Sequence, residues 1–383
     1  MAFSCNNLVL KNAVTDEGVR DVYISGAIIS GQIQTAQVID ATGLYVLPSF
    51  VDLHTHLRTP GFEHKENLES GCRAAIRGGY TAVNAMANTN PVCSDPSLAV
   101  KIAGNAEKLQ LCDVYQCVSA TWGFNGQSTD HLDALGNSRF DNAVRAVSDD
   151  GFGIADAEVF LEAMRKSMKY GKILMIHAEE EDFETLRDLK IIEKEHGRAH
   201  FCHVSTEVAA RAIMEAKARG ADVTWEVSPH HLALNNTTDF KVNPPLRPES
   251  DRRFLLECAR AGLPDAIATD HAPHTEQDKK SGSPGLVGLE SAFSVCNTLL
   301  SIENIKKLLC DGPRQILGLP QARVAAGYPA DLVLLDLSKE RKIEPSQFFS
   351  KGRNTPFVGM VTRGDVVYTI KGGVVKYEHG QIV

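Results

Sequence analysis

Two histidines one residue apart mark the end of an apolar run. In the segment FVDLHTHLRTPG, residues 50–61, hydrophobic residues give way to His54, His56 and Arg58. Alternate residues of a β-strand point to the same side, so the two imidazoles project together, with Arg58 next on that side if the extended geometry continues. Paired imidazoles at the end of a strand are suited to binding a metal ion.

Further ionisable residues occupy comparable places along the chain. They are Asp150 in AVRAVSDDG, His177 in KILMIHAEE, His203 in AHFCHVST and Asp270 in AIATDHAPH. Imidazole nitrogens and carboxylate oxygens suit Zn²⁺, and Mn²⁺ or Co²⁺ in its place. With the histidine pair they make six candidate ligands, more than one tetrahedral ion can use, so the pattern favours two ions over one. A carboxylate that reaches both would bridge them and leave a shared, activated water as nucleophile.

The elements that must position these side chains are short apolar runs that end in polar residues. There are eight of them, at residues 47–56, 80–89, 112–120, 143–151, 172–180, 199–206, 222–231 and 266–274. Between them Ala, Arg and Glu recur at helical spacing, as in VAARAIMEAKARGA, and glycine closes the segments. Strand and helix alternating eight times predict an α/β fold, a (β/α)8 TIM barrel with its reactive groups on the carboxyl-terminal face of the strands.

Two flanking segments do not share this rhythm. Residues 1–49 and 323–383 are predicted to form β-hairpins with glycine turns. Chain ends often lie close together, so these segments are expected to form one small composite β-sandwich beside a barrel made by residues 50–322. The histidines that do not end a strand are predicted to be surface residues, namely His64, His131, His196, His200 and His379.

Composition bears on the protein's partners and on its place in the cell. The net charge of −8 argues against nucleic acid as a partner. The cysteines are scattered, odd in number and without CxxC spacing, which favours a reducing cytoplasm. The first residues lack a basic segment followed by an apolar one, and no stretch reaches the roughly 18 apolar residues of a membrane helix, so we expect a cytoplasmic protein without membrane association.

Several motifs taken together carry a resemblance to a known family. DLHTHLRTPG, ANTNP, HAEE, HVST, SPHH, NPPLR and ATDHAPH occur in this order over nearly the whole chain. They resemble the dihydroorotases of the single-chain bacterial kind, within the amidohydrolase superfamily. The resemblance implies that His54, His56 and Asp270 bind a first metal, while His177 and His203 bind a second.

The same resemblance implies a carboxylate bridge between the metals. Asp150 matches the bridging position, and its neighbour Asp149 is the competing candidate. Many relatives use a carbamylated lysine there, but AVRAVSDDG contains no lysine. The chain therefore resembles the branch in which aspartate is the bridge.

The family's substrate is L-dihydroorotate, which is opened reversibly to N-carbamoyl-L-aspartate in pyrimidine biosynthesis. Its carboxylate suits the guanidinium fork of Arg58, which the resemblance supplements with Asn88 and His274. Asn243 and the backbone near Gly288 are expected to bond the ring amide. The resemblance implies attack by a metal-bridging hydroxide, with Asp270 as general acid and base.

Simpler interpretations and other functions remain open at this point. Arg58 could be a surface cation, and Asn88 a turn former before Pro91. One alternative function is a related cyclic amidase, such as a hydantoinase or allantoinase. Another is a catalytically inactive scaffold for aspartate transcarbamoylase, although such relatives have usually lost metal-binding histidines. A homodimer and a complex with aspartate transcarbamoylase are the expected assemblies to test.

Overall fold

Eight parallel strands form a closed barrel in the computed structural model, which describes residues 7–33 and 36–383. The strands are β6 Phe50–Thr55, β7 Tyr80–Ala85, β8 Asp113–Gln116, β9 Ala146–Val147, β10 Ile173–Ile176, β11 Arg198–Phe201, β12 Asp222–Val227 and β13 Ala266–Ile267. They pair in chain order as two sheets, β6 to β8 and β9 to β13. Parallel bridges between Val118 and Val147 and between Thr55 and His271 close the ring. The predicted barrel is confirmed.

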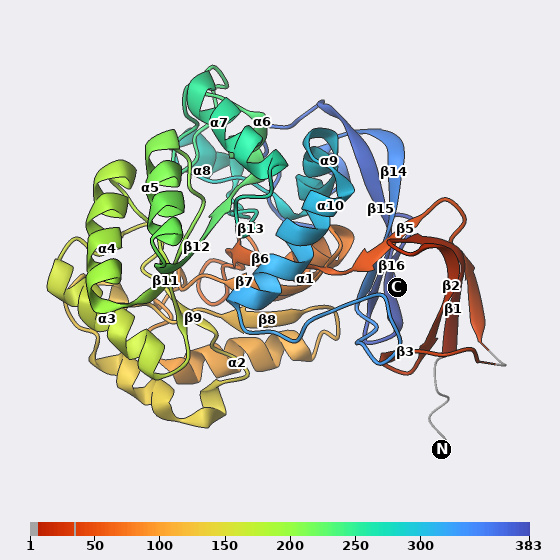
Figure 1. The fold of residues 1–383 in the computed structure, drawn as a ribbon, viewed down its shortest axis with the longest axis horizontal. Helices are drawn as coiled ribbons and strands as arrows, with labels where there is room; N and C mark the ends of the chain where they lie inside the picture. The colour runs from red at the N-terminus through yellow and green to blue at the C-terminus, as the bar shows by residue number, and fades with distance from the viewer. Residues whose placement is uncertain (1–6, 34–35) are drawn as a thin grey trace.

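Helices cover the outside of the barrel (Figure 1). The longer ones are α1 Leu68–Arg77, α2 Pro96–Glu107, α3 Ala157–Lys169, α4 Glu181–Glu195, α5 Glu207–Ala218, α7 Glu249–Arg260 and α9 Leu289–Leu299. Shorter ones are α6 Pro229–Ala233, α8 Glu276–Lys280, α10 Ile302–Ile305 and α11 Gly312–Ile316, with a π-helical turn at Lys306–Asp311. Their buried faces pack on strands whose residues are apolar on both sides, as expected for a parallel sheet covered by helices.

The third strand–helix unit departs from the predicted repeat. Between β8 and β9 the chain forms three 3₁₀ segments, Trp122–Phe124, Asp130–Gly136 and Ser138–Phe140, where the repeat predicts an α-helix. Gly123 and Phe124 both have positive φ there, 60° and 62°. The glycine-rich and asparagine-rich sequence GFNGQSTD favours such turns over a continuous helix.

The two ends of the chain join in one sheet at the right of Figure 1. The amino-terminal strands are β1 Asn7–Thr15, β2 Gly18–Ser25, β3 Ile28–Ser30, β4 Gln37–Asp40 and β5 Tyr45–Pro48. The carboxyl-terminal strands are β14 Leu332–Lys342, β15 Val361–Lys371, β16 Val374–Glu378 and β17 Gln381–Ile382, with a 3₁₀ turn at Pro345–Gln347. Strands β5 and β14 pair antiparallel, with Leu332 opposite Pro48, which joins the two ends.

The sheet has its own core, separate from that of the barrel. Leu10, Ile24, Val46, Leu334 and Ile370 belong to this buried cluster. Residues between β14 and β15 return to the barrel, where Phe348 and Phe357 pack against Leu246, Val287 and Val295. We retain residues 1–49 with 323–383, and residues 50–322, as proposed domains; residues 1–6 and 34–35 of the first lie outside the described residues.

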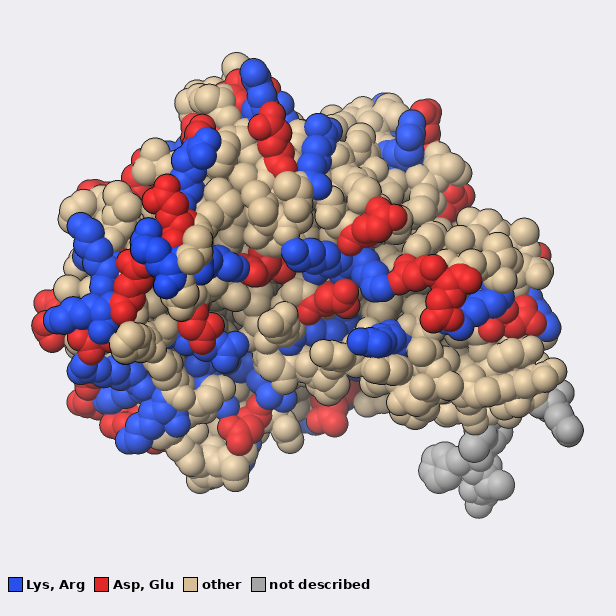
Figure 2. All heavy atoms as spheres, viewed as in Figure 1, with Lys and Arg blue, Asp and Glu red and all other residues tan. Residues whose placement is uncertain are grey.

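The surface carries mixed charges, and the described cysteines are buried and free. Acidic and basic side chains are interspersed over the face shown in Figure 2. No helix within residues 7–33 and 36–383 is both long and apolar enough to cross a bilayer. The eight cysteines from Cys72 to Cys310 are buried and unbridged, while Cys5 lies outside the described residues.

Candidate metal centre

His54, His56 and Asp270 meet at the carboxyl end of β6. Nε2 of His54 lies 3.7 Å from Oδ1 of Asp270, and Nε2 of His56 lies 3.4 Å from the same oxygen. The backbone N–H of His56 donates to the carbonyl oxygen of His271 at 2.8 Å, which holds the end of β6 beside the segment after β13. The histidine pair and Asp270 therefore form a compact buried group, as the strand-end argument predicts.

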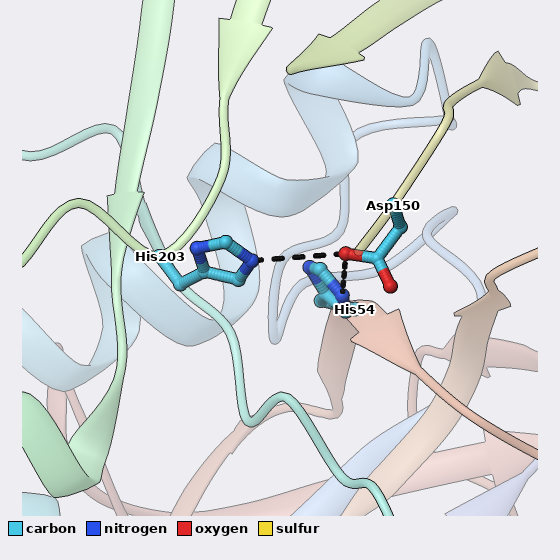
Figure 3. A group of neighbouring side chains, drawn as sticks. All are labelled: His54, Asp150 and His203. Carbon is cyan, nitrogen blue, oxygen red and sulfur yellow. Dashed lines mark ion pairs between the residues drawn. The ribbon is translucent and has the colours of Figure 1, made fainter. Parts of the chain in front are cut away.

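Asp150 lies between this group and the second pair of histidines. Its Oδ1 is 3.1 Å from Nε2 of His54 and 3.1 Å from Nδ1 of His177. Nε2 of His203 is 3.7 Å from that oxygen and 2.9 Å from Nδ1 of His177. Figure 3 shows His54 and His203 directed at Asp150 from different strands. The structure thus brings together all six predicted ligands.

The neighbouring carboxylates Asp149 and Asp150 point to different partners. Asp149 accepts hydrogen bonds from the backbone N–H of Thr121 at 2.9 Å and from its hydroxyl group. Asp150 faces the histidines. This geometry favours Asp150 over Asp149 as the bridging candidate.

Backbone conformation helps to direct these groups into the mouth of the barrel. Arg58, His203 and Asp270 have positive φ values of 58°, 33° and 47°. This region costs a residue with a Cβ about 1–3 kcal/mol, and such residues cluster where surrounding structure imposes a functional geometry. Each of the three follows directly or closely on a barrel strand, where the chain turns away from the sheet.

The charges of the site favour a bound cation. Burial would raise the pKa of Asp150, but His54 and His177 lower it well below its ordinary value. Burial would lower the pKa of His177, yet Asp150 and Glu179 raise it to about 9. Burial instead lowers the pKa of His56 and His203. With its lowered pKa, Asp150 stays ionised and favours a proton on His177, and a metal ion would replace that proton.

Unpartnered ring nitrogens provide a test of whether the residues fit a metal. Both ring nitrogens of His54, Nδ1 of His56 and Nδ1 of His203 are buried without a hydrogen-bond partner. Ligand atoms of His54, His56 and Asp270 lie within 4.8 Å of one another, as do those of His54, Asp150 and His203. Buried polar atoms are costly without partners, so these donors fit metal ligation.

The residues predicted to bind the substrate carboxylate lie beside this group. Nη2 of Arg58 is 3.2 Å from Nε2 of His274, and Nε of Arg58 donates to the carbonyl oxygen of Pro273 at 3.3 Å. Burial, followed by the charges of Arg58 and Lys65, lowers the pKa of His274 to about 3. His274 is therefore neutral, and its Nε2 can accept a hydrogen bond from the Arg58 guanidinium.

Asn88 and Asn243 also contact the metal-binding candidates. Nδ2 of Asn88 donates to the carbonyl oxygen of Asp150 at 2.8 Å, and its buried Oδ1 has no partner. Nδ2 of Asn243 lies 3.3 Å from Nε2 of His177 and donates to Glu179 at 3.2 Å. The structure places both asparagines at the site.

The backbone of Gly288 is engaged within the protein. Its N–H donates to Nδ1 of His271 at 3.2 Å, and its carbonyl oxygen accepts from the N–H of Ser291 at 3.1 Å. A Cβ at this position would lie 3.0 Å from the carbonyl oxygen of Thr269. Gly288 is thus close to Asp270 in the fold, while its role in binding the ring amide stays a prediction.

One prediction about a histidine is wrong. His200 was expected at the surface but is fully buried on β11, where Nε2 lies 3.1 Å from Glu226 and Nδ1 lies 2.9 Å from Oγ1 of Thr224. Its partner lies on the neighbouring strand β12, and their pairing is not visible in the local sequence. His64, His196 and His379 are exposed as predicted, and His131 is partly buried with Nε2 2.7 Å from the carbonyl oxygen of Ser119.

Sequence reasoning also missed buried carboxylates that support the site. Asp52 accepts from the backbone N–H of Thr269 at 3.0 Å, next to Asp270, and from the N–H of His54 at 3.3 Å. Glu226 lies beneath His54 and His203. The sequence does contain a signal for these carboxylates, an acidic residue inside a predicted barrel strand, in VDLH and in WEVS. A buried charge needs a specific partner, so such a residue indicates a polar contact within the barrel.

Comparison with known proteins agrees with the motifs and the fold. Dihydroorotase from Clostridium botulinum is 40% identical over 97% of this chain and 99% of its own length. Dihydroorotase from Bacillus subtilis is 35% identical over the full length of both chains. L-Hydantoinase (dihydropyrimidinase) from Arthrobacter aurescens has a TM-score of 0.87 at 22% identity, covering 99% of this chain and 98% of its own, and so shares the fold.

A sequence profile described as the Amidohydrolase family matches residues 45–376, which include the whole barrel and most of the strands contributed by the carboxyl-terminal segment. The chain therefore belongs to the amidohydrolase family.

Proposed function

We propose that this protein is a dihydroorotase, which interconverts L-dihydroorotate and N-carbamoyl-L-aspartate in pyrimidine biosynthesis. The observation that carries the proposal is the pairing of Arg58 with His274, 3.2 Å apart, beside the cluster of imidazoles and carboxylates. The planar guanidinium provides parallel N–H donors that match a carboxylate, which this substrate has. The names of the bacterial relatives support the same activity.

We propose Zn²⁺ as the metal, as one or two ions, with Mn²⁺ or Co²⁺ as substitutes. His54, His56 and Asp270 would hold the first ion, and His177 and His203 the second, with Asp150 shared between them. When bound, the metal lowers the pKa of a water molecule towards neutrality and polarises the ring carbonyl. The burial of all these side chains excludes bulk water, which strengthens every charge interaction within the site.

Asp270 is the proposed general acid and base. Burial would raise its pKa, but His56 and His54 lower it below its ordinary value, so the carboxylate is ionised and able to accept a proton. In ring opening it takes the proton of the attacking water and passes it to the departing ring nitrogen; ring closure reverses these transfers. Arg58, Asn88 and His274 hold the substrate carboxylate, while Asn243 and the Gly288 backbone would face the ring amide.

The competing functions have weaker support. The hydantoinases resemble this chain at only about a fifth of positions, a level that indicates a shared fold and leaves the substrate open. An inactive scaffold would not need its ligands kept in place, whereas the four histidines and two carboxylates here converge.

A homodimer, an aspartate transcarbamoylase complex and a cytoplasmic location stay predictions. Light scattering tests the first, co-purification the second and cell fractionation the third.

The direct test is the rate at which the purified protein opens L-dihydroorotate, with zinc supplied and again after chelation. Hydantoin and dihydrouracil serve as comparison substrates. We expect a zinc-dependent rate that is highest for L-dihydroorotate. A higher rate with hydantoin would favour the cyclic amidase, and no rate with any ring in the presence of zinc would favour the scaffold.

A further inference from the structure

A carboxylate without an assigned role lies beneath His54. Glu226 is on β12 and is fully buried. Its Oε1 is 3.6 Å from Nδ1 of His54 and accepts a 3.3 Å hydrogen bond from the backbone N–H of His203. A single oxygen atom therefore touches two of the histidines proposed to hold metal.

The two nitrogens of the His54 ring face different groups. Nε2 is directed at Asp150, 3.1 Å away, as the dashed line in Figure 3 marks, while Nδ1 is the second ring nitrogen. That second nitrogen is the one nearest Glu226. At 3.6 Å Nδ1 of His54 and Oε1 of Glu226 are close but form no hydrogen bond in this structure; a proton on Nδ1, on the side of Glu226, would leave the lone pair of Nε2 for the metal.

His200 anchors the other oxygen of Glu226. Its Nε2 lies 3.1 Å from Oε2 of Glu226, and its Nδ1 lies 2.9 Å from Oγ1 of Thr224, so the ring is held at both ends. Both oxygens of Glu226 are thus engaged in a fully buried position, Oε2 by His200 and Oε1 by the backbone N–H of His203.

Cys202 lies close enough to His54 and Glu226 for the three to be considered a metal site of their own. Both oxygens of Glu226 already have partners, so support of His54 fits this group better than a third metal site.

We propose that Glu226, held in place by His200, is a positioning residue that orients His54 for metal binding and ties it to His203. This inference rests on the proposed metal-dependent function and adds a residue to its machinery. A carboxylate on the far nitrogen fixes the tautomer of a ligating histidine and raises its basicity, and loss of such a partner typically weakens metal affinity about 10- to 100-fold.

The test is the zinc affinity of Glu226→Gln, measured by competition with a chelator of known affinity. Glutamine keeps the size of the side chain but removes its charge. We expect binding about 10- to 100-fold weaker than in the unmodified protein, together with an altered visible spectrum of the Co²⁺-substituted protein. Glu290→Gln is the matched control, because Glu290 is also a buried carboxylate, bonded to the N–H groups of Phe349 and Ser350. Its zinc affinity is expected to stay within about twofold.

His200→Leu provides a second route to the same answer. It removes the anchor of Glu226 without changing any proposed ligand, and we expect up to about a tenfold loss of zinc affinity. In a double variant with Glu226→Gln the His200 change should add little, since both act through one carboxylate. If Glu226→Gln does not fold, the zinc affinity of His200→Leu alone tests the role of Glu226.

Unchanged zinc affinity and Co²⁺ spectra in folded variants would overturn the role of Glu226, even with full activity in the unmodified protein. Equal losses in Glu226→Gln and Glu290→Gln would also overturn it, since a general structural effect would then explain both. Failure of the unmodified protein to bind zinc would instead reject the proposed function on which the inference rests.

Discussion

The Glu181 carboxylate accepts a 2.7 Å hydrogen bond from the backbone N–H of Ser205. Glu181 follows the HAEE motif's histidine by four residues, and Ser205 lies two residues after His203, so this bond joins the segments after β10 and β11. Arg247 adds a third segment, since its Nη2 is 3.1 Å from Glu181 and its Nε donates to Oγ of Ser205 at 2.9 Å. Three motifs, HAEE, HVST and NPPLR, are thereby held around one buried carboxylate.

Glu181→Ala is therefore expected to loosen the second half of the metal centre. The substitution leaves the N–H groups of Ser205 and Thr206 without their acceptor, at a cost of about 1–3 kcal/mol for each unsatisfied group. Urea unfolding measures this loss, and zinc analysis should show reduced metal content. The exposed neighbour Glu180 supplies the control: Glu180→Ala should match the unmodified protein in both measurements, and an equal loss there would contradict the prediction.

Arg58→Ala should reduce turnover of L-dihydroorotate while leaving bound zinc nearly unchanged. The side chain of Arg58 forms its hydrogen bonds with Pro273 and His274, neither of which is among the six proposed ligands. Loss of two charge-assisted hydrogen bonds to a substrate carboxylate, at about 1.5 kcal/mol each, corresponds to about a 100-fold lower kcat/KM. Arg58→Lys keeps the charge without the fork and should be intermediate. Near-normal kinetics in Arg58→Ala would remove this residue from the site.

Much of this arrangement could be predicted from the sequence because its signals are local. Each barrel strand is an apolar run with a polar end, and the barrel rule places those ends on one face, so His54, Asp150 and Asp270 could be expected to meet. The contact between Glu226 and His200 could not be anticipated in this way. It depends on the register of β11 against β12, in which His200 is opposite Thr224, and residues 26 positions apart must be brought together by the fold.

Other differences arise where a local pattern has more than one physical outcome. The segment after β8 contains residues of helical character, such as DHLDALG, but glycines and asparagines before it break the helix into 3₁₀ turns. Asp149 and Asp150 are adjacent acids, and the sequence alone does not show which one faces the histidines. In the fold Asp149 accepts from Thr121, while Asp150 lies beside His54. The partner of Glu290 lies near residue 350, beyond the reach of any short-range pattern.

Removal of zinc should lower stability as well as abolish activity. A ligand that binds only the folded state adds to the free energy of unfolding, by about 2.7 kcal/mol at a free concentration 100 times its dissociation constant. Without metal, the ionised Asp150 is left beside buried imidazoles, of which His177 has its pKa raised to about 9. Calorimetry of the chelated and zinc-supplied protein measures the difference in Tm. Equal Tm values, together with zinc-dependent turnover, would mean that the metal is bound too weakly for the proposed buried centre.

Glu290 provides a pH-dependent contribution to stability that is separate from the metal ligands. Burial raises its folded-state pKa to about 7, from an ordinary value of 4.5, although the N–H groups of Ser350 and Phe349 act in the opposite direction. Well below pH 4.5 the carboxyl group is protonated in both folded and unfolded states. Between these values the unfolded chain releases its proton first, so stability falls as pH rises, by up to about 3 kcal/mol.

Glu290→Gln removes this titration, since its amide stays neutral at every working pH. The unmodified protein should therefore lose more stability than the variant between about pH 5 and about pH 7.5. Over this range its unfolded chain releases the proton of Glu290, whereas in the folded state burial opposes ionisation of that group; the variant has no such group. Urea unfolding of both proteins at the two pH values measures the difference. Burial also raises the pKa of Asp188 to about 7, but that group is present in both proteins and cancels from the comparison. Parallel losses in the two proteins would show that Glu290 is ionised in the folded state throughout this range.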